Sequence, residues 1–112
     1  MTRVIFAGNT LTVDDKSVTM DFAIREALEI DDVIVVLLDP DADLGTQSQY
    51  KNLIGLNANG EILWHADLPT ARRSDVYWRI ASRSPLIASS FSSYDCEIDV
   101  RTGKVIRTDF YK

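Results

Sequence analysis

The sequence predicts an all-β protein in which about ten short strands form an antiparallel meander, folded into a curved or two-layer sheet. The first observation behind this prediction is a strand–turn–strand pattern that occurs twice, at residues 53–64 and 96–107. The second is the recurrence of Gly, Pro, Asn and Asp turn signals at intervals of about ten residues, which is typical of antiparallel β domains. A chain of 112 residues has the size of one domain, so we expect residues 1–112 to form a single domain.

The chain opens with two predicted turns. Residues 3–14 read as a hairpin because Gly8 and Asn9 favour the positive φ angles that a tight turn requires. A second turn leads into residues 18–22, where apolar and polar side chains alternate. This alternation has the period of a half-buried strand.

Residues 24–30 are compatible with two structures. Ala, Leu, Arg and Glu are good helix formers, whereas the Asp31-Asp32 turn that follows makes the segment the first strand of a hairpin. We favour the strand, and a helix near 22–30, which would make the fold α+β, remains the alternative. Residues 33–38 are apolar at every position and mostly β-branched, so we expect them to form a central strand buried on both faces.

The second half continues with strands separated by clear turns. A proline and a run of small polar residues predict a loop at 39–49. The first copy of the hairpin follows. Residues 76–81 and 86–91 then read as strands on either side of a turn at Ser84-Pro85, and the second copy of the hairpin closes the chain.

The strand at 76–81 predicts which side chains are buried. Two-residue alternation places Trp78 and Ile80 in the core and leaves Tyr77 and Arg79 on the surface. The serines between residues 82 and 93 contain no Gly-x-Ser-x-Gly pattern and read as polar strand faces and turns.

The first copy of the hairpin ends in Gly-Glu-Ile-Leu-Trp at residues 60–64, and it resembles the blade repeat of quinoprotein-type β-propellers. In the second copy Arg107 stands where that repeat has Trp. A closed ring needs at least four blades of about 40 residues, so the resemblance implies blade-like hairpins and carries over no cofactor residues. The whole chain resembles small bacterial all-β proteins built from such hairpins. Some proteins of this kind are immunity proteins, which neutralise a toxin of a contact-dependent inhibition system.

Charge is unevenly distributed along the chain. The net charge is -5, and residues 1–50 hold ten acidic side chains against three basic ones. An acidic surface repels phosphate backbones and attracts basic partners. The longest apolar run, 33–38, is too short to span a bilayer, and the N-terminus has no secretory signal pattern. We therefore expect a cytoplasmic protein with a basic protein partner, which binds neither nucleic acid nor membrane. The oligomeric state stays open.

Alternating carboxylates at Asp39, Asp41 and Asp43 suit a hard cation such as calcium. A calcium-binding EF-hand loop that starts at Asp39 would need Gly and Glu at two positions where Leu44 and Tyr50 stand. The sequence therefore predicts no metal site here, and we expect these carboxylates to form a contact surface or a solvated loop.

The other reactive residue types occur without partners in the sequence. His65 is the single histidine, so a catalytic role would lack the usual orienting group. Cys96 lies in an alternating apolar segment and reads as a small buried hydrophobe. The arginines between 72 and 83 are interleaved with Tyr77 and Trp78, a pattern that also suits single-stranded nucleic acid. The acidity of the chain argues against that interpretation.

Together these observations predict a non-enzymatic protein-binding module without a cofactor. Its most concrete form is an immunity protein that neutralises a basic toxin such as a nuclease. The alternatives are a structural or assembly subunit and a small enzyme that uses His65. The residues that we expect to contact the basic partner are Asp31, Asp32, Asp39, Asp41 and Asp43.

Overall fold

The computed structural model describes residues 3–41 and 49–110, and these residues form eleven strands and no helix. The described residues therefore include no helix that could cross a membrane. The predicted all-β class is confirmed. The strands are β1 (Val4–Ala7), β2 (Thr10–Val13), β3 (Lys16–Thr19), β4 (Ile24–Ile30), β5 (Val33–Leu38), β6 (Leu53–Leu56), β7 (Ile62–His65), β8 (Tyr77–Arg83), β9 (Leu86–Ser90), β10 (Tyr94–Ile98) and β11 (Val105–Phe110).

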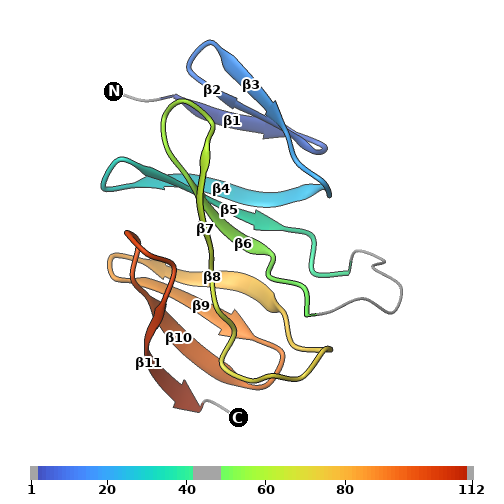
Figure 1. Ribbon diagram of the computed structural model, residues 1–112, viewed down its shortest axis with the longest axis vertical. Coiled ribbons are helices and arrows are strands. Elements are labelled where there is room, and N and C mark those ends of the chain that lie inside the picture. Colours follow the sequence, from blue (N-terminus) through green and yellow to red (C-terminus); the bar gives the residue numbers. More distant parts are fainter. Residues whose placement is uncertain (1–2, 42–48, 111–112) are drawn as a thin grey trace.

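The strands form three antiparallel sheets stacked on one another, which is one layer more than the two expected (Figure 1). The first sheet has the order β1-β2-β3, the middle sheet β4-β5-β6-β7 and the third sheet β8-β9-β10-β11. Each sheet is a meander, since strands that follow each other in the chain are hydrogen-bonded neighbours.

Residues 24–30 form a strand, so the helix alternative is wrong. β4 pairs with β5 from Ile24↔Leu38 to Ile30↔Val33, and the two residues of the Asp-Asp turn join them. This segment contains good helix formers, but β5 offers its backbone hydrogen-bond partners along the whole length of β4. The free energy of this pairing outweighs the small intrinsic preference of the residues for a helix.

β5 is the central strand, as its composition predicted, and all six of its residues are buried. Val33, Val35 and Leu37 point into the core between the middle and third sheets. The residues between them point into the core between the first and middle sheets. An apolar residue at every position is therefore required, because both faces of this strand are covered.

Two cores hold the stack together. The first core, between the first and middle sheets, is built around Leu11, Val13, Met20, Ile34, Val36, Leu38, Ile54 and Leu56. The second core, between the middle and third sheets, is built around Val33, Val35, Leu37, Leu53, Trp64, Ala66, Tyr77, Leu86, Ala88, Cys96 and Ile98.

The two copies of the repeated hairpin occupy equivalent positions. The first copy forms β6 and β7, the last two strands of the middle sheet, and the second forms β10 and β11, the last two strands of the third sheet. Trp64 of the first copy reaches the turn of the second, where its indole Nε1 donates a 2.8 Å hydrogen bond to the carbonyl oxygen of Val100. At the matching position of the second copy, Arg107 is exposed.

The predicted faces of β8 are wrong at Tyr77. Its side chain is fully buried in the second core, whereas Trp78 is only partly buried. The register shifts between Tyr77 and Arg79, so Trp78 is an extra residue that opposes no partner on β9. A bulge of this kind interrupts the two-residue alternation, which brings both Tyr77 and Ile80 to the inner face.

The serines of β9 also differ from their prediction as a polar strand face. Ser89 and Ser90 are fully buried. The Ser89 hydroxyl donates a 2.6 Å hydrogen bond to the carboxylate of Asp95 and accepts a 3.1 Å hydrogen bond from Arg79 Nε. A hydroxyl group that is shielded from water needs hydrogen-bond partners within the protein. Arg79 and Asp95 supply these partners for Ser89 and cover it on the outer side of the third sheet.

A buried amide fastens the middle sheet to the third sheet. Asn52 Nδ2 donates to the carbonyl oxygens of Leu38, at 3.0 Å, and of Tyr77, at 2.7 Å. Asn52 Oδ1 accepts a 3.0 Å hydrogen bond from the backbone N–H of Tyr77. Asn52 is itself fully buried, so these three bonds satisfy backbone groups that water cannot reach.

Candidate functional site

Three connections have their described residues at one end of the molecule, which we call the loop end (Figure 1). They are the described residues between β5 and β6 (39–41 and 49–52), the connection 66–76 between β7 and β8, and the turn 91–93 between β9 and β10. Binding residues are commonly carried by loops that a rigid β scaffold positions. The loop end is therefore where a site is expected.

Hydrogen bonds to neighbouring segments fix the shape of the 66–76 connection. Gln49 Nε2 donates to the carbonyl oxygens of Thr70, at 2.7 Å, and of Arg72, at 2.8 Å. At the other end of the connection, the hydroxyl of Tyr77 donates a 2.6 Å hydrogen bond to the carbonyl oxygen of Asp67. These bonds hold the connection in place before any ligand binds.

A buried carboxylate joins this connection to the 91–93 turn. Asp75 is 2% exposed, and its Oδ2 accepts hydrogen bonds from the hydroxyls of Thr70, at 2.7 Å, and Ser92, at 3.0 Å. Its Oδ1 accepts from the backbone N–H groups of Val76, at 3.0 Å, and Ser92, at 3.3 Å. Four donors thus compensate for the loss of water around the carboxylate.

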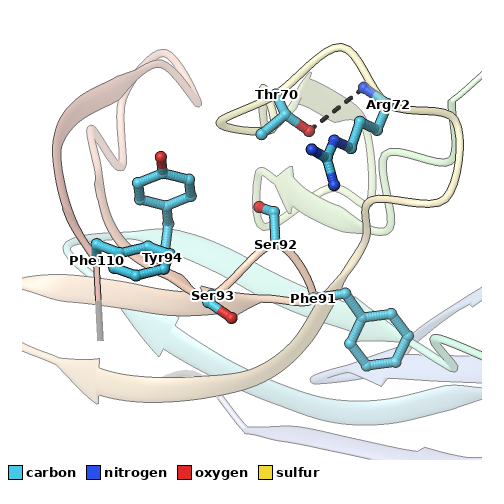
Figure 2. A pocket seen from close by; sticks show the side chains of 7 residues that line it. All are labelled: Thr70, Arg72, Phe91, Ser92, Ser93, Tyr94 and Phe110. Carbon is cyan, nitrogen blue, oxygen red and sulfur yellow. Dashed lines mark hydrogen bonds between the residues drawn. The ribbon is translucent and has the colours of Figure 1, made fainter. Parts of the chain in front are cut away.

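Between the connection and the turn lies a cleft of about 360 Å³, shown in Figure 2. Tyr94 and Phe110 stand on one side of it and Phe91 on the other, while Ser92 and Ser93 lie between them. A smaller hollow of about 60 Å³ shares part of this lining and extends to Asp75. The residues that line the main cleft are Thr70, Arg72, Phe91, Ser92, Ser93, Tyr94 and Phe110.

The aromatic side chains of the cleft remain accessible to solvent. Phe91 is 56% exposed and Phe110 is 62% exposed. The rings of Tyr94 and Phe110 meet edge to face with their centroids 5.4 Å apart. Ser93 adopts a φ of 73°, a left-handed conformation that is uncommon for residues other than glycine. It closes the tight turn that presents Phe91 on one side and Tyr94 on the other.

The cleft suits recognition by contact. Arg72 contributes a fixed positive charge with several N–H donors, and the aromatic rings contribute apolar surface. The hydroxyls of Thr70 and Ser92 donate their protons to Asp75. The Thr70 oxygen also accepts a 3.3 Å hydrogen bond from the backbone N–H of Arg72, and the Ser92 oxygen lies 2.8 Å from the Ser90 hydroxyl, so both are fixed mainly by the protein itself. The arginine and the aromatic rings can hold a partner side chain that has an apolar body and a polar or charged tip.

The five carboxylates predicted to contact a partner do not lie on one surface. Asp31 and Asp32 form the two-residue turn that precedes β5, with φ angles of 49° and 70°. Asp39 and Asp41 follow β5 at the loop end. At about 3.3 Å per residue, the strand separates the two pairs by roughly 20 Å. Asp43 lies outside the described residues.

Asp39 is engaged by its own neighbours. Its Oδ1 lies 3.1 Å from Arg25 in an ion pair and accepts a 2.9 Å hydrogen bond from the backbone N–H of Asp41. Burial raises the pKa of Tyr50 to about 12, and the charges of Asp39 and Asp21 contribute to the same shift. In the part of the chain that the structure describes, no three His, Cys, Asp or Glu side chains are grouped as metal ligands.

The two isolated reactive residues lie outside the cleft. His65 is exposed at the end of β7, opposite Ile54 of β6, while the preceding Trp64 is buried in the second core. Cys96 is fully buried, which confirms its interpretation as a small buried hydrophobe. The pKa of Cys96 is raised to about 11, chiefly by burial; a hydrogen bond with Tyr77 lowers it, and the charges of Asp75 and Asp95 raise it.

The predicted basic and aromatic stretch does not form a continuous surface. Arg72 lines the cleft. Arg79 stacks over the ring of Trp78 at 4.9 Å on the third sheet. Arg83 is at the opposite end of that sheet, where it donates a 2.8 Å hydrogen bond to the carbonyl oxygen of Glu29. The three arginines therefore lie on separate parts of the described structure.

Sequence reasoning missed the cleft itself. The signal that could have revealed it is Phe-Ser-Ser-Tyr at residues 91–94, where two aromatic residues flank a short polar turn. An aromatic residue in a turn is often exposed, and an exposed aromatic ring is a candidate contact residue. Its partners Thr70, Arg72 and Phe110 are too distant in the sequence for any local pattern to include them.

The fold and the cleft define an all-β protein of three stacked antiparallel sheets, with an arginine and three aromatic rings gathered at the loop end. The chain belongs to the family described as Domain of unknown function (DUF7957), whose model matches residues 1–110. Among curated proteins and solved structures, none matches the chain.

Proposed function

We propose that this protein is a non-enzymatic protein-binding module that contacts its partner through the loop end. The observation that carries this proposal is the cleft, where Arg72 lies among Phe91, Tyr94 and Phe110. Aromatic residues and arginine are enriched at the centres of protein interfaces, and a few such residues provide most of the binding energy. Two of the three rings are more than half exposed, so a partner would remove apolar surface from water.

The charge of the chain supports a basic partner. The net charge of -5 produces a long-range attraction that speeds encounter with a basic protein. Asp39 and Asp41 lie at the same end as the cleft and can contact such a partner directly. Asp31 and Asp32 lie at the opposite end and contribute through the overall field.

In its most concrete form, the module is an immunity protein that covers a basic bacterial toxin such as a nuclease. Nucleases carry basic surfaces because they bind phosphate backbones. The acidity of the chain and its resemblance to small bacterial proteins with blade-like hairpins support this version. A four-stranded antiparallel meander is the arrangement of a propeller blade, and each copy of the hairpin ends such a meander.

The cleft is tested by comparing variants as baits. Arg72→Glu with Phe91→Ser changes two exposed residues of the cleft, whereas Arg101→Glu changes an exposed arginine at the opposite end. A protein captured from the source cell should be lost with the cleft variant and retained with the Arg101 variant. Circular dichroism checks that both variants fold. Equal capture by both variants would contradict the proposal.

A second pair of variants separates direct contact from long-range attraction. Asp31→Asn with Asp32→Asn and Asp39→Asn with Asp41→Asn each remove two negative charges. Asparagine tolerates the positive φ angles of the first pair, so both variants should fold. Direct contact predicts faster dissociation of the captured partner only in the variant changed at 39 and 41. If both variants alter only the association rate, the acidic residues act through the field alone.

The immunity version has a readout of its own. The captured protein, expressed alone, should arrest growth, and co-expression of this chain should restore it. Co-expression of the cleft variant should fail to do so. A captured protein without toxicity would remove the immunity version and leave the binding proposal in place.

A further inference from the structure

β11 forms one edge of the third sheet (Figure 1). It pairs with β10, and in the part of the chain that the structure describes no strand pairs with its other edge. An open edge presents backbone N–H and C=O groups that can pair with another chain, and natural proteins usually protect such an edge. β11 has two such protective features, exposed charged side chains and a bulge in its pairing with β10. It also exposes two large apolar side chains, Ile106 at 60% and Phe110 at 62%.

The exposed apolar side chains of β11 lie on one face and its charges on the other. Phe110 opposes Tyr94 and Thr108 opposes Cys96, whose side chain is buried in the second core. Ile106 lines a hollow together with Leu86 and Ile98, which also belong to the second core. The inner face of β11 therefore carries Thr108 and Phe110. Ile106 borders the same side at a bulge, where it is an extra residue that opposes no partner on β10, because Ile98 pairs with Val105.

The outer face of the same strand is charged. Arg107 opposes Glu97 of β10, and Asp109 opposes Asp95. Arg107 and Asp109 form an ion pair with each other at 3.0 Å, and their side chains are 69% and 64% exposed. An exposed pair of this kind contributes little to stability, so both groups can exchange partners readily.

The order of these residues makes the strand complementary to itself. Residues 106–110 read as apolar, cationic, threonine, anionic and apolar. When two such strands run antiparallel with Thr108 opposite its own copy, Arg107 of each chain faces Asp109 of the other. In the same register Ile106 of each chain lies across from Phe110 of the other, at the bulge where β11 departs from regular pairing with β10. Opposite charges and apolar side chains placed directly across a strand pair both stabilise it.

We infer that the edge of β11 is a docking surface for β11 of a second copy of this chain, in a two-fold symmetric antiparallel pair centred on Thr108. The two third sheets would join into one continuous sheet of eight strands. A two-fold interface uses the same patch on both chains, which is what a self-complementary strand supplies. Pairing along a single strand buries little surface, so we expect a weak dimer that forms with rising concentration.

Repulsion between like charges also disfavours the registers on either side of the one centred on Thr108. A shift of two residues in one direction would place Arg107 opposite Arg107 of the second copy. A shift in the other direction would place Asp109 opposite Asp109. Like charges directly across a strand pair are destabilising, and a shift of one residue would set apolar side chains against charged ones. The register centred on Thr108 is therefore favoured over each of its neighbours.

Sedimentation velocity from micromolar to millimolar concentration tests this inference. The wild-type chain should shift from monomer to dimer as concentration rises. Arg107→Asp alone and Asp109→Arg alone should each keep the chain monomeric, because each places like charges across the two-fold axis. The double variant, Arg107→Asp with Asp109→Arg, should restore the dimer. All of these changes are at exposed positions, so circular dichroism should show unaltered folding.

A cysteine at the two-fold axis tests the register. Opposed Cα atoms in an antiparallel pair lie about 4.5–5.5 Å apart, which suits a disulfide. Thr108→Cys should therefore form a covalent dimer on oxidation. Ile106→Cys is the matched control on the same face, because its two copies would lie roughly 13 Å apart along the strands. Both variants also carry Cys96→Ala, because Cys96 opposes Thr108 on the neighbouring strand of the same chain and could otherwise form a disulfide within that chain.

Sedimentation tests whether the dimer forms, and crosslinking tests its register. A wild-type chain that remains monomeric at every concentration overturns it and leaves the edge of β11 free for a strand from another protein. A double variant that stays monomeric, or equal crosslinking at positions 106 and 108, overturns the register. Phe110 belongs to both surfaces, whereas the cleft variants change Arg72 and Phe91 on other segments, so failure of the dimer and failure of the cleft proposal are measured separately.

Discussion

The indole ring of Trp64 lies directly against the backbone of Gly103, so the first copy of the repeated hairpin is docked on the turn of the second. A Cβ atom added at Gly103 would lie 2.7 Å from Cδ2 of Trp64. The hydrogen bond from Trp64 to the carbonyl oxygen of Val100 fixes the ring over the same turn. The two copies therefore have different roles, since the first provides the aromatic ring and the second provides the surface that receives it.

Gly103→Ala should be strongly destabilising. Gly103 has a φ of 76°, and its added methyl group would overlap the Trp64 ring, so we expect the free energy of unfolding to fall. Backbone strain and overpacking together suggest a loss of about 3 kcal/mol. Gly8→Ala is the control, because Gly8 has a φ of 59° with nothing within 4 Å, and strain alone suggests about 1 kcal/mol. Urea unfolding measures both, and equal losses would contradict the docking role.

Asn52→Ala should weaken the connection between the middle and third sheets. The substitution removes three hydrogen bonds and leaves the backbone groups of Leu38 and Tyr77 without partners. Buried groups left unsatisfied suggest a loss of about 3 kcal/mol in the free energy of unfolding. Asn59→Ala, in an exposed turn, should change it by about 0.5 kcal/mol or less. A loss at Asn52 no greater than this control would show that water replaces the amide.

Stability should fall under alkaline conditions. The pKa of Cys96 is raised from 9.0 to about 11 and that of Tyr50 from 10.0 to about 12, so the folded state holds these protons more tightly than the unfolded state. Their contribution is complete below pH 9.0 and is lost as pH rises toward 11 and 12. Each group should lower the free energy of unfolding by about 1.4 kcal/mol per pH unit within its window.

Cys96→Ala separates the two contributions. The variant should lose the decline that begins near pH 9. It should keep the decline that begins near pH 10, to which Tyr50 and Tyr77 both contribute, because burial raises the pKa of each tyrosine above 10.0 in the folded state. Urea unfolding at intervals between pH 7 and the alkaline limit of reversibility gives the slopes. An unchanged slope between pH 9 and pH 10 would show that Cys96 does not govern the first decline.

Asp75→Asn should loosen the cleft. An amide in place of the carboxylate would turn an N–H donor toward the hydroxyls and N–H groups that now donate to Asp75, and we expect a loss of about 2 kcal/mol. Amide hydrogen exchange should rise around residues 70–75 and 91–93. Asp67→Asn removes only an exposed ion pair with Lys51 and should cost about 0.5 kcal/mol or less. Unchanged exchange at both walls of the cleft would argue against the proposed role of Asp75.

Most of the fold follows from local patterns. The Asp31-Asp32 turn, the apolar run of β5 and the glycine-containing turns act over a few residues, so their chemistry can be read directly. The prediction of buried and exposed side chains failed where pairing with a neighbouring strand interrupted the two-residue alternation. At Trp78, pairing with β9 inserts a bulge, and Tyr77 becomes a core residue although alternation placed it on the surface.

The candidate site was much less predictable. The acidic residues are obvious in the sequence, but β5 separates the two described pairs, since strand direction places its two flanking turns at opposite ends. The cleft joins Thr70 and Arg72, the 91–94 turn and Phe110. No periodicity relates these segments. They meet because buried groups such as Asp75 and Asn52 connect elements that are far apart in the chain.

Turn chemistry and two-residue alternation are properties of neighbouring residues, and they were sufficient to establish an all-β chain, its strands and a central strand buried on both sides. They could not assign the strands to three sheets or place the ring of Trp64 on Gly103. Those features depend on side-chain packing between sheets, whose energy depends on shape and burial across long sequence separations. Packing between the sheets also brought an arginine and three aromatic rings together at the loop end.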